Sequence, residues 1–277
     1  MQHIRPGSEV DCRAEARLTD DALRVGLITL RSDGQERIDF FRNRLMVPLR
    51  TPEGEMHGFC GRLLSGEGPA LLYSKASELF RKSGLLFGWD LAITELRLLK
   101  RVLFLEGFMD CMSLHQAGVH HAVGVLSEPP TLDVLKRIKQ LGVKEAQVLL
   151  PHEVAPPDSL LRWAQVLLEA ELPSTVVELA PGQRLEPLLA QERREGLEAL
   201  FASARPLSRH LFDKVLPGGA QSTLEEKLRA LATLAPMLSH APEGLSRSTL
   251  VAAMAIHFGV PESELKDRLK PTDAPGP

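Results

Sequence analysis

The chain has little of several things that would fix its class at once. Among its 277 residues are only three cysteines, Cys12, Cys60 and Cys111, and no two of them stand in a CxxC spacing. A zinc site or a disulfide framework is therefore not expected, and free thiols in a reducing compartment are the simplest interpretation. No apolar run approaches the ~20 residues that cross a bilayer, and the N-terminus has no signal-peptide pattern. The sequence thus predicts a cytoplasmic protein without a membrane partner.

The sequence also lacks a strong charge of one sign. Its formal net charge is -3, and charged residues make up 25% of the chain, which is ordinary for a globular protein. A phosphate-binding surface, if present, must therefore be local, with acidic faces elsewhere. Hydrophobic residues account for 44% of the chain, which at this length is enough for a core in two lobes.

The N-terminal part alternates short apolar runs with turn residues. Residues 45–49 and 56–64 are predicted to be strands, and the Thr-Pro-Glu-Gly turn at 51–54 joins them into a β-hairpin. A loop is expected at 65–75. Helical spacing of apolar residues predicts helices around this hairpin at 18–28, 77–82 and 88–100.

From residue 102 the chain repeats a strand followed by a helix. This alternation is typical of a parallel α/β sheet, whose ligands bind at the carboxyl ends of the strands. Two tryptophans, Trp89 and Trp163, fall at apolar positions of helices and are expected in the core. The predicted strands are 102–105, 121–126, 146–150 and 175–179, and the helices between them are 109–116, 131–140 and 157–172.

The C-terminal part is predicted to be wholly helical, with a short frayed tail. The helices are expected at 185–204, 206–215, 223–238 and 246–258. The patterns together divide the chain into a leader, a mixed subdomain with the hairpin, a central sheet, a helical subdomain and the tail. The corresponding ranges are 1–17, 18–100, 101–182, 183–270 and 271–277.

The stretch from Val102 to Asp110 carries the strongest chemical signal. A short apolar run ends at Glu106, Gly107 permits a tight turn, and Asp110 falls in the first turn of the next helix. Two carboxylates at the carboxyl end of a buried strand suit a divalent cation and phosphate chemistry. The sequence therefore predicts a catalytic and metal-linked site at Glu106 and Asp110.

Several motifs resemble, in order and in spacing, those of the catalytic core of bacterial replicative primases. The run FRNRLMVPLR at 41–50 is similar to a strand of that family, and GFCGR at 58–62 is similar to its GFGGR. EGFMD at 106–110 resembles its EGYMD, the first acidic motif of the Toprim fold, and RPLS at 205–208 resembles its later helices. The resemblance extends from about residue 18 to residue 270.

The resemblance implies an α/β fold in which a mixed N-terminal subdomain with a β-hairpin precedes a central Toprim parallel sheet flanked by helices and a C-terminal helical subdomain. It also implies synthesis of RNA primers on single-stranded DNA, with two divalent metals held by carboxylates. The implied template-binding positions are Arg42, Arg44, Arg50, Arg62 and Lys82. The implied metal-binding positions are Glu106, Asp110, Glu153 and Glu186.

The basic positions have two interpretations. They suit contacts to backbone phosphates, but a solvated strand face with local ion pairs would show the same pattern. Arg50 and Arg62 are expected to face each other across the hairpin, where they would repel unless an anion lay between them. That expectation favours phosphate contact.

The resemblance fails at the later acidic motifs. The family's Asp-Gly-Asp falls on 151–153, which is Pro-His-Glu here, and its Asp-Pro-Asp falls on 184–186, which is Arg-Leu-Glu. A full set of six carboxylates carries about minus six, whereas four carboxylates and one guanidinium carry about minus three. Two Mg²⁺ ions would overcompensate this charge, and Mg²⁺ tolerates altered geometry poorly. We therefore predict a primase-like protein that binds Mg²⁺ or Mn²⁺ weakly or not at all, with primer synthesis lost or severely reduced.

Three functions remain open from the sequence alone. The first is a binding or regulatory module of replication or repair, acting on single-stranded DNA or on a replication or repair protein. The second is an active minimal primase, or a related Toprim phosphotransferase or nuclease, in which Asp158 replaces a lost acid. The third is a structural protein that binds only another protein.

Overall fold

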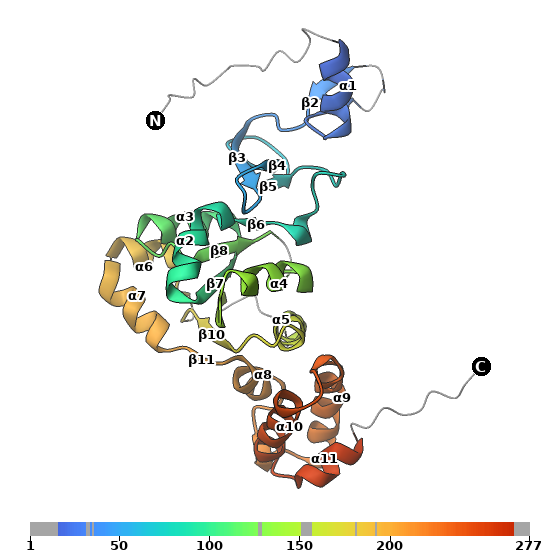
Figure 1. Cartoon of the computed structure of the whole chain (residues 1–277), viewed down its shortest axis with the longest axis vertical. Coiled ribbons are helices and arrows are strands. Elements are labelled where there is room, and N and C mark those ends of the chain that lie inside the picture. Colours follow the sequence, from blue (N-terminus) through green and yellow to red (C-terminus); the bar gives the residue numbers. More distant parts are fainter. Residues whose placement is uncertain are drawn as a thin grey trace, which may run out of the picture. The chain divides into compact units, whose positions relative to one another are not determined.

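The computed structural model in Figure 1 describes residues 16–31, 34, 36–126, 129–150, 157–180, 182–191 and 193–268. Within these ranges the protein has a mixed α/β fold, with small antiparallel sheets, a larger and mostly parallel sheet, and helices that flank it. The fold class expected from the sequence is thereby confirmed. The chain packs as two compact units, Met1–Lys82 and Ser83–Pro277, while the subdomain boundaries expected at residues 100 and 182 stay a prediction.

The first unit begins with a short helix and a two-stranded sheet. The helix α1 (Ala16–Arg24) is followed by β1 (Ile28–Leu30) and β2 (Arg37–Asp39), which pair in antiparallel fashion. The expected helix over 18–28 was therefore too long. Gly26 has a φ of 75°, a left-handed conformation that suits glycine, and there the chain leaves the helix for β1.

The second sheet of this unit contains the expected hairpin. Its order is β3 (Arg44–Arg50), β4 (Met56–Leu63) and β5 (Leu71–Tyr73), and both pairings are antiparallel. The hairpin is confirmed, whereas β5 lies where only a loop was expected, because three residues give too little alternation to predict a strand.

The expected helix over 77–82 is wrong. The chain there is irregular until a 3-10 turn, η1 (Lys82–Gly84). The ring of Phe80 is buried over Gly58, where a β-carbon would lie 2.6 Å from it. Burial of this ring against the sheet favours the irregular path over a helix.

The second unit is built on a six-stranded sheet. Four central strands are mutually parallel, as predicted, and one antiparallel strand of two residues closes each edge. The edge strands were not predicted, because two residues show no periodicity. The order across the sheet is β11 (Arg205–Pro206), β10 (Ser174–Glu178), β9 (Glu145–Leu150), β7 (Arg101–Glu106), β8 (Ala122–Val125) and β6 (Leu86–Phe87).

Helices lie on both faces of this sheet and continue beyond it (Figure 1). The expected single helix over 185–204 is instead two helices that pack against each other, α6 and α7, so the chain must turn between them. A last helix, α11, was not predicted. The helices are α2 (Trp89–Leu99), α3 (Phe108–Gln116), α4 (Leu132–Gln140), α5 (Pro157–Glu169), α6 (Leu185–Gln191), α7 (Arg193–Ala202), α8 (Leu207–Val215), α9 (Leu224–His240), α10 (Leu245–Phe258) and α11 (Glu262–Arg268).

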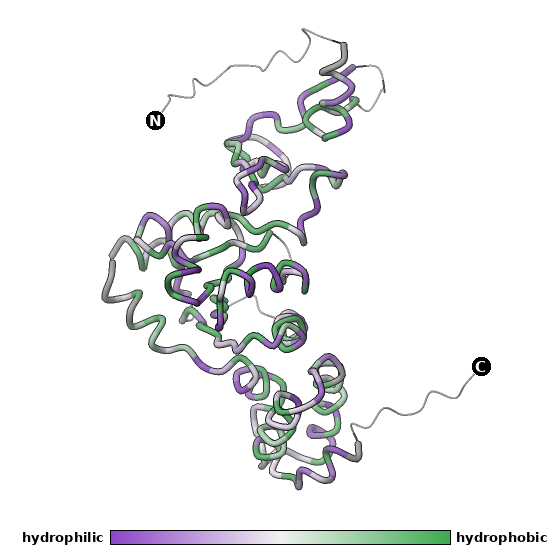
Figure 2. Tube along the Cα trace, viewed as in Figure 1, coloured by the Kyte–Doolittle hydropathy of each residue, from purple (hydrophilic) through white to green (hydrophobic). Residues whose placement is uncertain are grey.

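The main core fills one face of the sheet. Alternate residues of the strands, such as Phe104 and Val148, pack there against apolar residues of α2, α4, α5 and α8. Trp89 and Trp163 are each 1% exposed, which confirms their assignment to the core, and the rings of Phe104 and Trp163 lie 5.3 Å apart. Figure 2 shows β8 as a hydrophobic stretch and α4 as a helix with hydrophilic residues. Along the described residues, no helix is both long and apolar enough to cross a bilayer.

Candidate functional site

The carboxyl edge of the sheet places two glutamates in one row. Leu105 of β7 lies opposite Leu149 of β9, so the next residue, Glu106, lies beside Leu150, which in turn pairs with Glu178 of β10. In-register residues of parallel strands point to the same face, and strands are about 4.8 Å apart. The backbones of Glu106 and Glu178 are therefore about 10 Å apart, and both side chains face the helices of the main core.

Glu106 lies where the sequence predicted it, at the end of the central strand β7. It shares its face with Phe104 and so points to the side of α5. The residue is exposed, yet the protein packed around its carboxyl group raises the pKa of Glu106 by desolvation, while the positive charge of Arg162 on α5 opposes this rise. The sequence interpretation missed Arg162, because nothing in the spacing shows that this residue of α5 lies near Glu106.

Gly107 makes the turn from β7 to α3. Its φ is 83°, and its amide donates a hydrogen bond to the carbonyl of Val125, 3.0 Å away on β8. The turn passes so close to Gly124 that a β-carbon there would lie 2.6 Å from the carbonyl oxygen of Gly107. Both positions therefore require glycine. A glycine inside a strand can indicate such a close backbone approach. Gly124 lies inside the predicted strand, so the sequence offered this indication.

Asp110 lies in the first turn of α3, as predicted, and is exposed. An acid at this end of a helix is favoured by the helix dipole. Arg184 is also exposed, directly before α6, and α6 packs against α3. The segment that carries Arg184 is thus a neighbour of the helix that carries Asp110.

The other expected acids are only partly described. Glu186 is in the first turn of α6, and its backbone alone is described. Glu153 lies outside the described residues. Asp158 is exposed in the first turn of α5. The structure therefore places Glu106 and Asp110 at this edge, with the charge of Arg162 acting on Glu106 and with Arg184 before a helix that packs against α3. The metal-binding role of the four expected acids stays a prediction.

The five basic positions of the first unit divide into two groups. Arg44 donates a hydrogen bond to the carbonyl of Gly61 at 3.0 Å, and Arg50 donates one to the carbonyl of Gly54 at 2.8 Å. These two guanidinium groups stabilise their own hairpin. The other three positions are exposed, and they are Arg42, Arg62 and Lys82.

The expected repulsion between Arg50 and Arg62 is wrong. Arg50 pairs with Met56 at one end of the hairpin, whereas Arg62 pairs with Leu45 at the other. A register bulge between Leu49 and Arg50 also interrupts the alternation near the turn. An anion between these two arginines is therefore not needed, and the argument for phosphate contact has to rest on the exposed cations.

Tyr73, an aromatic residue beside Lys82, was not among the predicted site residues. Tyr73 of β5 lies opposite Cys60 of β4, and the ammonium group of Lys82 lies 4.4 Å from the centre of the Tyr73 ring. Burial raises the pKa of the Cys60 thiol to about 11, against the hydrogen bond with Tyr73, and burial also raises the pKa of Tyr73. Cys60 and Cys111 are buried free thiols, as expected.

Taken with the fold, this edge defines a class of protein. The fold, a mostly parallel sheet preceded by small antiparallel sheets and followed by helices, is similar to that of primase catalytic cores. A family model described as the DNA primase catalytic core, N-terminal domain, matches residues 10–93. A DNA primase domain from Pseudomonas aeruginosa has a similar structure, with a TM-score of 0.81 and 25% identity over 92% of this chain and 80% of that one.

Curated sequences and a further structure also match primases. The DNA primase of Myxococcus xanthus is 38% identical over 250 residues, which are 90% of this chain and 41% of that protein. A primase catalytic domain bound to single-stranded DNA matches with a TM-score of 0.75 and 25% identity, over 89% of this chain and 80% of that one. The chain belongs to the family of bacterial DNA primase catalytic cores. It spans about two fifths of the length of the curated relatives that it matches.

Proposed function

We propose that the chain acts in DNA replication or repair as a primase-core protein that binds single-stranded DNA and has little or no primer synthesis. The observation that carries this proposal is the arrangement of cations at the carboxyl edge of the sheet. The charge of Arg162 acts on Glu106, and the ammonium group of Lys214 lies 2.8 Å from the carboxylate of Glu178. Arg184 stands where the family's third acidic motif has an aspartate.

This edge suits a divalent metal poorly. Glu106 and Asp110 would be the first ligands of such an ion, with Glu153 and Glu186 as the other acids that the family pattern offers. Two-metal phosphoryl transfer needs carboxylates that offset about four positive charges at a fixed spacing. Desolvation already disfavours the ionised form of Glu106, and the guanidinium group of Arg162 adds a positive charge near it. We therefore assign no reaction step to a metal here.

The DNA-binding half of the proposal rests on the exposed cations of the first unit. Arg42, Arg62 and Lys82 are exposed, whereas Arg44 and Arg50 are hydrogen-bonded to the hairpin backbone. Contacts from arginine and lysine to phosphates position a nucleic acid without reading its sequence. The similar catalytic domain bound to single-stranded DNA supports this ligand. A replication or repair protein is a second expected partner.

A primer-synthesis assay tests the catalytic half. On a single-stranded template with ribonucleotides and Mg²⁺ or Mn²⁺, we expect no RNA product above that of the Glu106→Gln variant, because the altered charge prevents paired-metal binding. The Glu106→Gln variant is the matched control, since it replaces the carboxylate with a neutral amide of almost the same shape. Abundant RNA made by the native chain but not by this variant would refute the proposed loss of catalysis.

Salt dependence tests the DNA-binding half. Three phosphate contacts predict that affinity for a single-stranded oligonucleotide falls about twentyfold between about 50 and 200 mM salt. Arg62→Gln should weaken binding and lower the logarithmic salt slope by about 0.7. Arg24→Gln, which changes an exposed arginine that forms an ion pair with Asp21 on α1, is the matched control and should leave both quantities unchanged. A flat salt profile of the native chain would contradict the assignment.

An active minimal primase is the second candidate. The observation that favours it is the turn from Glu106 through Gly107 to Asp110, which has the residues of the first acidic motif at the end of a strand and the start of a helix. Relocated acids, including Asp158, would then complete a Toprim site. Calorimetric titration with Mn²⁺ separates the two candidates, because an active site of this kind predicts two bound ions, and the primary proposal predicts one weak ion or none.

A further inference from the structure

The segment that carries Arg184 begins and ends at the same strand. The chain leaves the sheet after Glu178, the last residue of β10, forms α6 and α7, and returns as β11, which pairs antiparallel with β10. From β11 it enters α8 directly. We call residues 179–204 the excursion. Where the excursion returns to the sheet, only the two-residue strand β11 pairs with β10. Contacts of β10 and β11 with other elements therefore help to decide how firmly the excursion is held.

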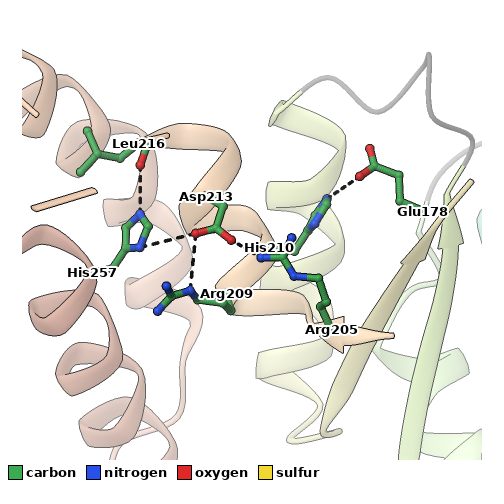
Figure 3. Close-up of polar contacts among 7 residues, drawn as sticks. All are labelled: Glu178, Arg205, Arg209, His210, Asp213, Leu216 and His257. Carbon is green, nitrogen blue, oxygen red and sulfur yellow. Dashed lines mark hydrogen bonds and ion pairs between the residues drawn. The ribbon is translucent and has the colours of Figure 1, made fainter. Parts of the chain in front are cut away.

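Glu178 makes such contacts with α8. Lys214 donates from Nζ to Glu178 Oε1 at 2.8 Å. His210 Nε2 lies 3.7 Å from Glu178 Oε2 (Figure 3). The His210 side chain is 4% exposed and that of Glu178 is 23% exposed. Within the described part of the chain, no hydrogen-bond partner reaches His210 Nε2. We call Glu178, His210 and Lys214 the Glu178 clamp.

The same helix makes further contacts through Asp213. Asp213 of α8 forms ion pairs with Arg205 of β11 and with Arg209, whose Nε lies 3.4 Å from Oδ1 (Figure 3). His257 of α10 lies 3.6 Å from Asp213 through Nδ1, and its Nε2 is 3.0 Å from the carbonyl oxygen of Leu216. These contacts fix α8 between β11 and α10, so α8 is a firm support for Glu178.

We propose that the Glu178 clamp is a positioning device: through it, α8 fixes the excursion and therefore the place of Arg184 and α6 beside α3. Lys214 and His210 are positioning residues, since they act through Glu178 and touch no reacting group. This inference rests on the proposed function for the importance of Arg184. The test of the clamp measures backbone opening and needs neither DNA nor primer synthesis. The clamp and the proposed function can therefore fail separately.

The clamp is expected to weaken in acid. Burial lowers the pKa of His210, the cations Lys214 and Arg205 lower it further, and the carboxylates Glu178 and Asp213 oppose them. Because the folded-state pKa lies below the unfolded value, the contribution of neutral His210 is fully present above about pH 6.5 and is lost as the pH falls towards the folded-state pKa. A phenylalanine at this position has a similar shape and no charge to gain.

Hydrogen exchange followed by mass spectrometry tests the clamp. In Glu178→Gln, amides of 182–191 are expected to exchange about three- to tenfold faster, because Lys214 loses its charged partner. Glu145→Gln is the matched control. It breaks the 2.5 Å ion pair with Arg101 at the amino ends of β9 and β7 and should leave the exchange of these amides unchanged. Lys214→Met breaks the same ion pair from the side of α8 and should speed the exchange of these amides in the same way. It provides an independent test if Glu178→Gln folds poorly.

A pH series completes the test. In the native chain, exchange of residues 182–191, corrected for its intrinsic pH dependence, should quicken between about pH 7 and pH 5.5, and His210→Phe should abolish this change. Unchanged protection in both Glu178→Gln and Lys214→Met would overturn the clamp. The same pH response in His210→Phe would overturn the role of His210.

Discussion

Replacing Gly124 with alanine is expected to lower the free energy of unfolding of the second unit by about 2–3 kcal/mol. The new β-carbon would lie 2.6 Å from the carbonyl oxygen of Gly107 and 3.2 Å from its carbonyl carbon. These are backbone atoms, so no side chain can rotate away, and the turn after Glu106 must shift. Urea denaturation, followed by the fluorescence of the buried tryptophans, measures the loss.

Gly84 provides the control for this change. A β-carbon at Gly84 would meet nothing within 4 Å, so Gly84→Ala adds the same methyl group without a clash. We expect its free energy of unfolding to stay within about 0.5 kcal/mol of the native value. Equal stability of Gly124→Ala and Gly84→Ala would show that the turn from Glu106 to Asp110 is not constrained by β8.

Replacing Arg184 with aspartate is expected to raise the affinity for Mn²⁺ about tenfold. The change makes the local charge more negative by two, and at about 10 Å in water a divalent ion gains about 1.7 kcal/mol from it. Isothermal titration calorimetry at low ionic strength measures the difference. The effect should shrink as salt is added, because Arg184 is exposed and its field is screened.

An exposed arginine away from this edge supplies the comparison. Arg97→Asp, in the last turn of α2, makes the same change of charge. If Arg97→Asp raised Mn²⁺ affinity as much as Arg184→Asp, the gain would reflect net charge alone. The idea that Arg184 opposes a metal at the carboxyl edge would then be wrong.

The large elements were predictable because their signals are local. Long apolar runs and repeated strand–helix spacing identified the parallel strands, and the capping position Thr131 marks the start of α4 as expected. The two-residue strands β6 and β11 and the short strand β5 have too few residues to show alternation. They form because neighbouring strands offer hydrogen-bonding partners, which a local pattern does not contain.

The site was predictable only along one strand. Glu106, Gly107 and Asp110 are adjacent in sequence, so their turn could be predicted from spacing. Arg162 and Glu178 come near this edge only in the folded chain, where Arg162 of α5 lies near Glu106 and β10 pairs with β9. The mistaken opposition of Arg50 and Arg62 has a similar origin, because the register of a hairpin depends on its turn and on the bulge beside Arg50.

The cross-strand row at the carboxyl edge has a consequence for how the chain could change by single substitutions. Leu150 stands between Glu106 and Glu178, one strand spacing from each, and its buried side chain points to their common face. The outer backbones are about 10 Å apart, a distance that two glutamate side chains can reach across, but the buried side chain of Leu150 lies between them. Replacing Leu150 with an acidic residue would place three carboxylates on neighbouring strands. The apolar side chain of Leu150 therefore separates the carboxylates of Glu106 and Glu178.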